Sequence, residues 1–125
     1  MKIAGSLLAA TFLALLAAMP VAALEGVTEK TVEVKFEYVA QHVADAIVNR
    51  GYIVDHRSFI GNMLERTRES VGSDKVIYRN AELVQFCSAV LSRRMMEADP
   101  ANIAYCPYVI FYYELPGKPG KVHVG

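Results

Sequence analysis

Apolar residues in the first half of the chain recur at steps of three and four, the period of a helix with one buried face. The spacing predicts a helix over residues 36–49, and Gly51 follows it where a helix C-terminal end favours glycine. A second helix is expected over residues 59–71, with Ser58 as its N-cap. Two amphipathic helices therefore occupy much of this half.

The second half carries runs of β-branched and aromatic residues that favour strands. Residues 108–114 are apolar or aromatic almost throughout. Such a run is typical of a central strand covered on both faces, or on one face and by a partner subunit on the other. Ser92 is expected to open a short helix that Pro100 ends. Strands are expected over residues 28–34, 52–54, 76–78, 82–90, 108–114 and 121–124. Two helices with four to six strands predict an α+β layered fold.

The first 23 residues have the pattern of a secretory signal. Lys2 precedes a short apolar stretch, Pro20 interrupts it, and small residues follow at positions 22 and 23. The alternative is an uncleaved membrane anchor, but the run is short for a span and no basic cluster follows it. We expect residues 1–23 to be a signal peptide, residues 24–125 to be a single α+β domain, and the protein to be exported, periplasmic or secreted.

Charge then excludes some partners. Without Lys2, 12 basic side chains face 13 acidic ones, so the mature chain is close to neutral. Neutrality gives no electrostatic basis for binding nucleic acid or, after signal cleavage, an anionic membrane. A domain of about a hundred residues buries a modest core, which a disulfide or a homodimer interface would reinforce.

Several segments together resemble the domain-of-unknown-function 302 family, over residues 31–124. The segments are the helix ending in Arg50-Gly51, then Asp55-His56, residues 84–89, residues 94–96 and Cys106-Pro107-Tyr108. The resemblance implies a curved, mainly antiparallel sheet packed against two helices, and often a dimer. It implies no particular activity.

Cys87 and Cys106 are the residues most suited to a chemical role. In an oxidising compartment a disulfide between them is expected; it would close a loop of about 20 residues and stabilise the fold by roughly 3 kcal/mol. A redox or sulfur-transfer thiol pair is the alternative, although neither thiol is expected at a helix N-terminus that would activate it. A soft-metal or haem site and inert buried thiols also stay open.

Other side chains could complete such a site. His56 lies between Asp55 and Arg57, and a neighbouring carboxylate can orient an imidazole as a base or ligand. A copper site would draw on Cys87, Cys106, His56, Met95 and Met96, whereas core packing is the more common role of such methionines. Tyr105, Tyr108, Tyr112 and Tyr113 are candidates for lining a ligand pocket or a dimer interface, although a plain core is the commoner place for such residues. His42 and His123 are expected to be solvated.

The sequence contains no complete catalytic motif. We therefore expect a non-enzymatic exported domain, without a resident cofactor, that binds a small ligand or a protein partner and forms a homodimer. A thiol-based redox or sulfur-transfer protein using the two cysteines is the competing hypothesis.

Overall fold

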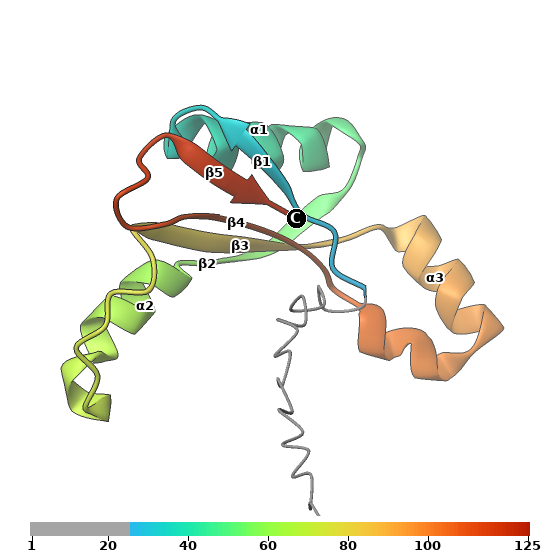
Figure 1. Ribbon diagram of the computed structural model, residues 1–125. Coiled ribbons are helices and arrows are strands. Elements are labelled where there is room, and N and C mark those ends of the chain that lie inside the picture. Colours follow the sequence, from blue (N-terminus) through green and yellow to red (C-terminus); the bar gives the residue numbers. More distant parts are fainter. Residues whose placement is uncertain (1–25) are drawn as a thin grey trace, which may run out of the picture.

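A computed structural model describes residues 26–125 and shows a five-stranded antiparallel sheet with helices on both sides (Figure 1). The strand order is β1-β5-β4-β3-β2, so β4 is the central strand and β1 and β2 are the edges. The elements are β1 (Lys30–Glu33), α1 (Phe36–Asn49), β2 (Ile53–Ser58), α2 (Ile60–Thr67), η1 (Glu69–Val71), β3 (Asn80–Cys87), α3 (Ala89–Ala98), η2 (Pro100–Tyr105), β4 (Tyr108–Glu114) and β5 (Lys121–Val124). The predicted α+β class is confirmed.

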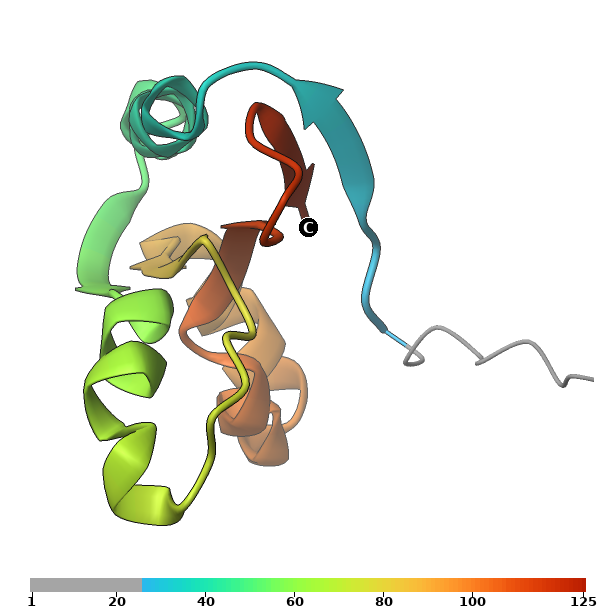
Figure 2. The same cartoon turned by 60° about the vertical axis from the view of Figure 1, so that its left-hand side comes forward.

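Helix α1 covers one face of the sheet and builds the core (Figure 2). The apolar stripe that its spacing predicts is buried, with Phe36 and Ile47 against the sheet. From the strands, Val84 and Tyr112 complete this core, and the Phe36 and Tyr112 rings lie 5.4 Å apart. Burial of one apolar helix face thus fixes α1 on the sheet.

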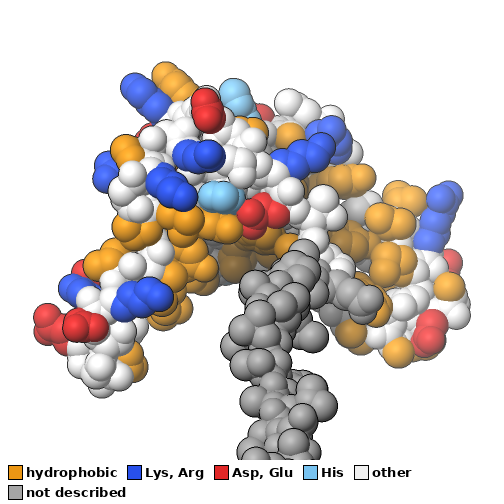
Figure 3. All heavy atoms as spheres, in the orientation of Figure 1, with side chains coloured by type: hydrophobic (Ala, Val, Ile, Leu, Met, Phe, Trp, Pro, Cys, Tyr) orange, Lys and Arg blue, Asp and Glu red, His pale blue; other side chains and the backbone are white. Residues whose placement is uncertain are grey.

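The opposite face of the sheet is less covered. Helices α2 and α3 project from it as two arms, with a stretch of sheet between them (Figure 1). Helix α2 approaches β3 closely, since a β-carbon on Gly61 would lie 2.9 Å from the Ala81 amide nitrogen. Between the arms, Val109 of β4 is 48% exposed, and apolar side chains gather on this side of the molecule (Figure 3). We call this the open face.

One buried carboxylate, that of Glu114, connects the ends of neighbouring strands. Glu114 is almost fully buried and accepts hydrogen bonds from the Gly120 amide and from Asn80 Nδ2, while Arg79 Nε lies 3.2 Å from its second oxygen. The residue before β5 is thereby held against the end of β4 and the start of β3. Because a buried charge needs such partners, Glu114 is a structural residue.

Several predicted boundaries are confirmed and others are wrong. The helix over residues 36–49 and the strands over 108–114 and 121–124 match α1, β4 and β5. Residues 76–78 form no strand, and the predicted helix over 59–71 divides into α2 and η1. The predicted signal, residues 1–23, lies outside the described residues. Within residues 26–125, no helix is both long and apolar enough to span a membrane.

The largest error concerns the strand predicted over residues 82–90. It ends at Cys87, and α3 begins at Ala89 rather than at Ser92. The reason is a cap, because Ser88 Oγ accepts a hydrogen bond from the Leu91 amide. Alternating apolar residues continue through Val90, so the pattern alone favours a longer strand.

Candidate functional site

The fold brings the two cysteines together. Cys87 is the last residue of β3, Cys106 lies two residues before β4, and these strands are hydrogen-bonded neighbours. The two Sγ atoms are 3.4 Å apart, and both side chains are half-buried. A disulfide bond is about 2.05 Å long, so the structure contains two thiols in contact rather than a disulfide. The expected bond is not formed in this structure, although the sulfurs are within reach of each other.

A bulge in the edge strand adds a carboxylate to this pair. Ile53 and Val54 pair with Cys87 and Phe86, but His56 then pairs with Gln85, so Asp55 is left as the extra residue. The Asp55 carboxylate lies close enough to the Cys87 thiol to influence its protonation. The neighbour that the sequence suggested as a partner for His56 therefore acts on Cys87.

Asp55 sets the protonation of Cys87. The Asp55 carboxylate, together with Cys106, raises the pKa of the Cys87 thiol from an ordinary value of 9.0 to about 12. The expectation that no helix begins near a thiol is wrong, since α3 starts two residues after Cys87. A helix N-terminus favours a thiolate, whereas a neighbouring carboxylate opposes one.

Cys106 has a different neighbour. Ser92, in the second turn of α3, places its Oγ 3.5 Å from the Cys106 sulfur. A hydroxyl can donate a hydrogen bond to a thiolate, whereas a carboxylate can only accept one from a thiol. The two sulfurs therefore lie in contact but in unlike surroundings.

The other predicted site residues are dispersed. His56 is exposed on the edge strand β2, and Tyr105 is 65% exposed in η2. Tyr108 packs its ring against Phe86 and donates its hydroxyl to Met95 Sδ at 3.1 Å. Thus Met95 contacts a tyrosine, and Met96 is half-buried on α3. Among residues 26–125, no three His, Cys, Asp or Glu side chains are grouped closely enough to hold a metal ion.

A hollow of about 360 Å³ opens on the open face, and neither cysteine lines it. Its walls come from the residues just before β1, from α2, from the loop before β3, and from β3 and β4. They are largely apolar and aromatic, and include Val27, Ile60, Tyr78, Leu83, Phe111 and Tyr113. The sequence pointed to Tyr112 and Tyr113 as possible pocket residues but not to the other walls, because these come from separate segments of the chain.

Two carboxylates, Glu29 and Glu82, line this hollow, and Glu29 contacts two aromatic side chains. Glu29 accepts a hydrogen bond from the Tyr113 hydroxyl at 2.9 Å, and its second oxygen lies 2.9 Å from His123 Nδ1. Since a carboxylate only accepts, that contact requires the hydrogen on Nδ1. The His123 ring also stacks on Tyr113 with centroids 4.6 Å apart, so the prediction that His123 is solvated is wrong.

Burial changes the chemistry of this tyrosine. Burial and the hydrogen bond to Glu29 together raise the pKa of Tyr113 to about 12. The phenol therefore stays protonated at neutral pH and keeps donating to Glu29. The Glu29 side chain is 37% exposed, and its oxygens can accept further hydrogen bonds.

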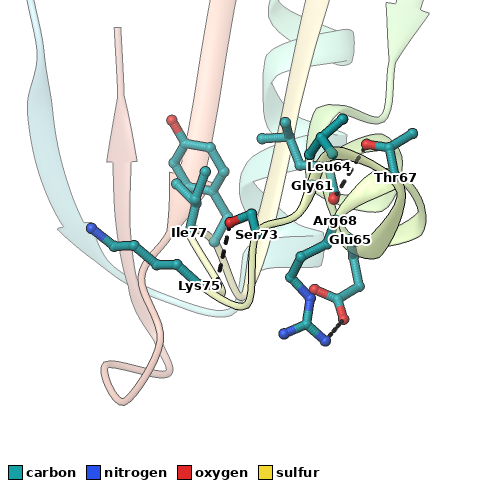
Figure 4. A pocket seen from close by; sticks show the side chains of 10 residues that line it. Gly61, Leu64, Glu65, Thr67, Arg68, Ser73, Lys75 and Ile77 are labelled. Carbon is teal, nitrogen blue, oxygen red and sulfur yellow. Dashed lines mark hydrogen bonds and ion pairs between the residues drawn. The ribbon is translucent and has the colours of Figure 1, made fainter.

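A smaller hollow of about 100 Å³ lies between α2 and the loop that follows η1 (Figure 4). Arg68 bridges its walls, with one nitrogen 3.0 Å from Glu65 and another donating to the Asp74 carbonyl. These contacts hold the loop on the helix, so the hollow is part of the scaffold.

No protein-family model, curated protein or solved structure matches the chain. The resemblance to the domain-of-unknown-function 302 family therefore stays a prediction. The thiol pair and the open face are the features of the structure that bear on function.

Proposed function

We propose that the mature chain is an exported, non-enzymatic binding domain that holds a small ligand in the hollow of the open face. The observation that carries the proposal is the hollow itself, whose volume of about 360 Å³ and aromatic walls suit a compact organic molecule. The signal-like N-terminus supports export. The resemblance to a family of compact α+β domains adds support for a binding module.

The hollow favours a particular kind of ligand. Leu83, Phe111 and Tyr78 offer apolar and aromatic surface, which suits a ring or an alkyl body. Glu29 and Glu82 are the acidic groups beside this surface. Glu82 is already bound to Arg57 and Tyr112, whereas both oxygens of Glu29 still have accepting capacity. The best complement is an apolar ring carrying an ammonium or another hydrogen-bond donor.

A matched pair of probes tests this ligand class. Phenethylamine and hydrocinnamate share an aromatic ring but carry opposite charges. We expect the amine to bind with a Kd of order 0.1–1 mM and the acid at least tenfold more weakly, measured by NMR titration of the mature protein. Resonances of residues in the hollow, such as Phe111, should shift on addition of the amine.

Substitution of Glu29 supplies the control. Glu29→Gln should remove the preference for the amine, whereas Glu97→Gln on the exposed surface of α3 should leave it intact. Equal binding of both probes to the unchanged protein would overturn the ligand class. A concentration-dependent dimer whose formation protects Val109 and Phe111 would instead identify a second copy as the occupant of the open face.

The thiol pair supports a second candidate function, a dithiol–disulfide couple. The specific observation is the 3.4 Å contact between the two sulfurs, which needs only a small movement to become a bond. Each role rests on its own residues. The open-face hollow and the thiol pair can therefore be tested separately.

A further inference from the structure

The surroundings of the two sulfurs differ enough to assign an order of attack. Cys87 has the Asp55 carboxylate, the extra residue of the β2 bulge, beside it. Cys106 instead has the Ser92 hydroxyl 3.5 Å from its sulfur. A carboxylate opposes a negative charge on its neighbour, while a hydroxyl donor can stabilise one.

We propose that the pair exchanges with an external disulfide, that Cys106 makes the first attack and that Cys87 resolves the mixed disulfide. The proposal rests on the second candidate function, the dithiol–disulfide couple. The co-substrate is any accessible disulfide of a small molecule or protein in the oxidising compartment.

The reaction proceeds in two balanced steps. Cys106 loses its proton to solvent, and its thiolate attacks one sulfur of the incoming disulfide, whose S–S bond breaks and releases one thiolate. Cys87 then loses its proton and attacks Cys106 Sγ across the 3.4 Å contact, releasing the second thiolate. Both released thiolates take up protons, so the external disulfide is reduced to two thiols while the protein pair loses two electrons and becomes a disulfide.

The expected difference in rate follows from the state of Cys87. A raised pKa gives Cys87 a smaller thiolate fraction than an ordinary thiol at a given pH. A more basic thiolate is also more nucleophilic, which recovers about half of the loss on a logarithmic scale. Solvent screens the Asp55 charge, so we expect a difference in rate of about tenfold.

The experiment uses the reduced mature protein and oxidised glutathione, followed by mass spectrometry. Cys87→Ser should accumulate a stable glutathione adduct on Cys106, and Cys106→Ser should react about tenfold more slowly. The unchanged protein should pass through the adduct to the Cys87–Cys106 disulfide. Equal rates in denaturant would show that the difference comes from the fold.

Asp55 is tested as a positioning residue in the Cys106→Ser background. Asp55→Asn should raise the rate of Cys87 about tenfold, while Asp74→Asn, an exposed carboxylate on the loop after η1, should not change it. Equal rates for the two single-cysteine variants, or faster reaction at Cys87, would overturn the order of attack. An unchanged protein that forms the adduct but never the internal disulfide would instead overturn the dithiol couple itself.

Discussion

At three points of this molecule an acidic side chain raises the pKa of a neighbouring thiol or phenol. Asp55 holds the proton on Cys87, Glu29 accepts from Tyr113, and Glu82 accepts from Tyr112 at 2.9 Å. None of these pairs is adjacent in the sequence. The sequence shows that these acidic, cysteine and tyrosine residues are present, but strand register decides which of them become partners.

Tyr112 and Tyr113 make the free energy of unfolding depend on pH in the alkaline range. Burial raises the pKa of Tyr112 and of Tyr113 to about 12, and hydrogen bonds to Glu82 and Glu29 add to the shift. An unfolded tyrosine titrates near pH 10. Because the folded state holds these protons more tightly, the stabilisation is complete below about pH 10 and is lost as pH rises through about 12.

Urea unfolding across this range, with phenolate absorbance, checks the expectation. The double variant Tyr112→Phe with Tyr113→Phe should lose free energy of unfolding less steeply above about pH 10 than the unchanged protein. Tyr38→Phe is the control, since Tyr38 is exposed on α1. Identical slopes for the double variant and the unchanged protein would contradict a role for the two phenols.

Element boundaries depend on local hydrogen bonds as well as on apolar spacing. Helix α1 starts and ends where its apolar period predicts, because the periodic residues are also the buried ones. The start of α3 differs, because the Ser88 cap ends β3 directly after Cys87. This boundary places Ser92 inside the helix, where its hydroxyl reaches Cys106.

The cap predicts a difference between two serines on the same segment. Ser88→Ala should lower the free energy of unfolding by about 1 kcal/mol, because the Leu91 amide loses its acceptor. Ser92→Ala should cost less than about 0.5 kcal/mol, since residue 92 lies in the helix. Urea denaturation of both variants measures the difference. A larger loss from Ser92→Ala would mean that α3 begins where the sequence pattern suggests.

At the scale of the whole molecule, the sheet is covered unequally. Helix α1 buries one face, whereas the arms α2 and α3 leave apolar surface between them on the other (Figures 1 and 3). The same strands therefore contribute both to the core and to the proposed ligand hollow. The expected homodimer would use this open face only if no ligand occupies it.

Two valines on the paired strands β3 and β4 test this asymmetry. Val84 is 2% exposed under α1, while Val109 is 48% exposed on the open face. Val84→Ala should destabilise the fold by about 2 kcal/mol, and Val109→Ala by less than about 1 kcal/mol. Denaturant unfolding at low and high protein concentration measures both. A large loss for Val109→Ala that grows with concentration would show that a second copy covers this face.

The sequence by itself determined the features that are encoded by neighbouring residues. The three- and four-residue spacing predicts α1, the apolar run predicts β4, and the α+β class follows from their combination. The cysteines were recognisable as the candidate chemistry from their type and from the signal-like N-terminus. In each case the information lies in composition or in a short repeat.

Only the tertiary structure decided which side chains meet. Glu29 and His123 are 94 positions apart, and they join because β1 and β5 pair antiparallel. Asp55 reaches Cys87 because a one-residue bulge shifts the register of β2 against β3. Strand order and register depend on packing over the whole domain, and no local pattern encodes them.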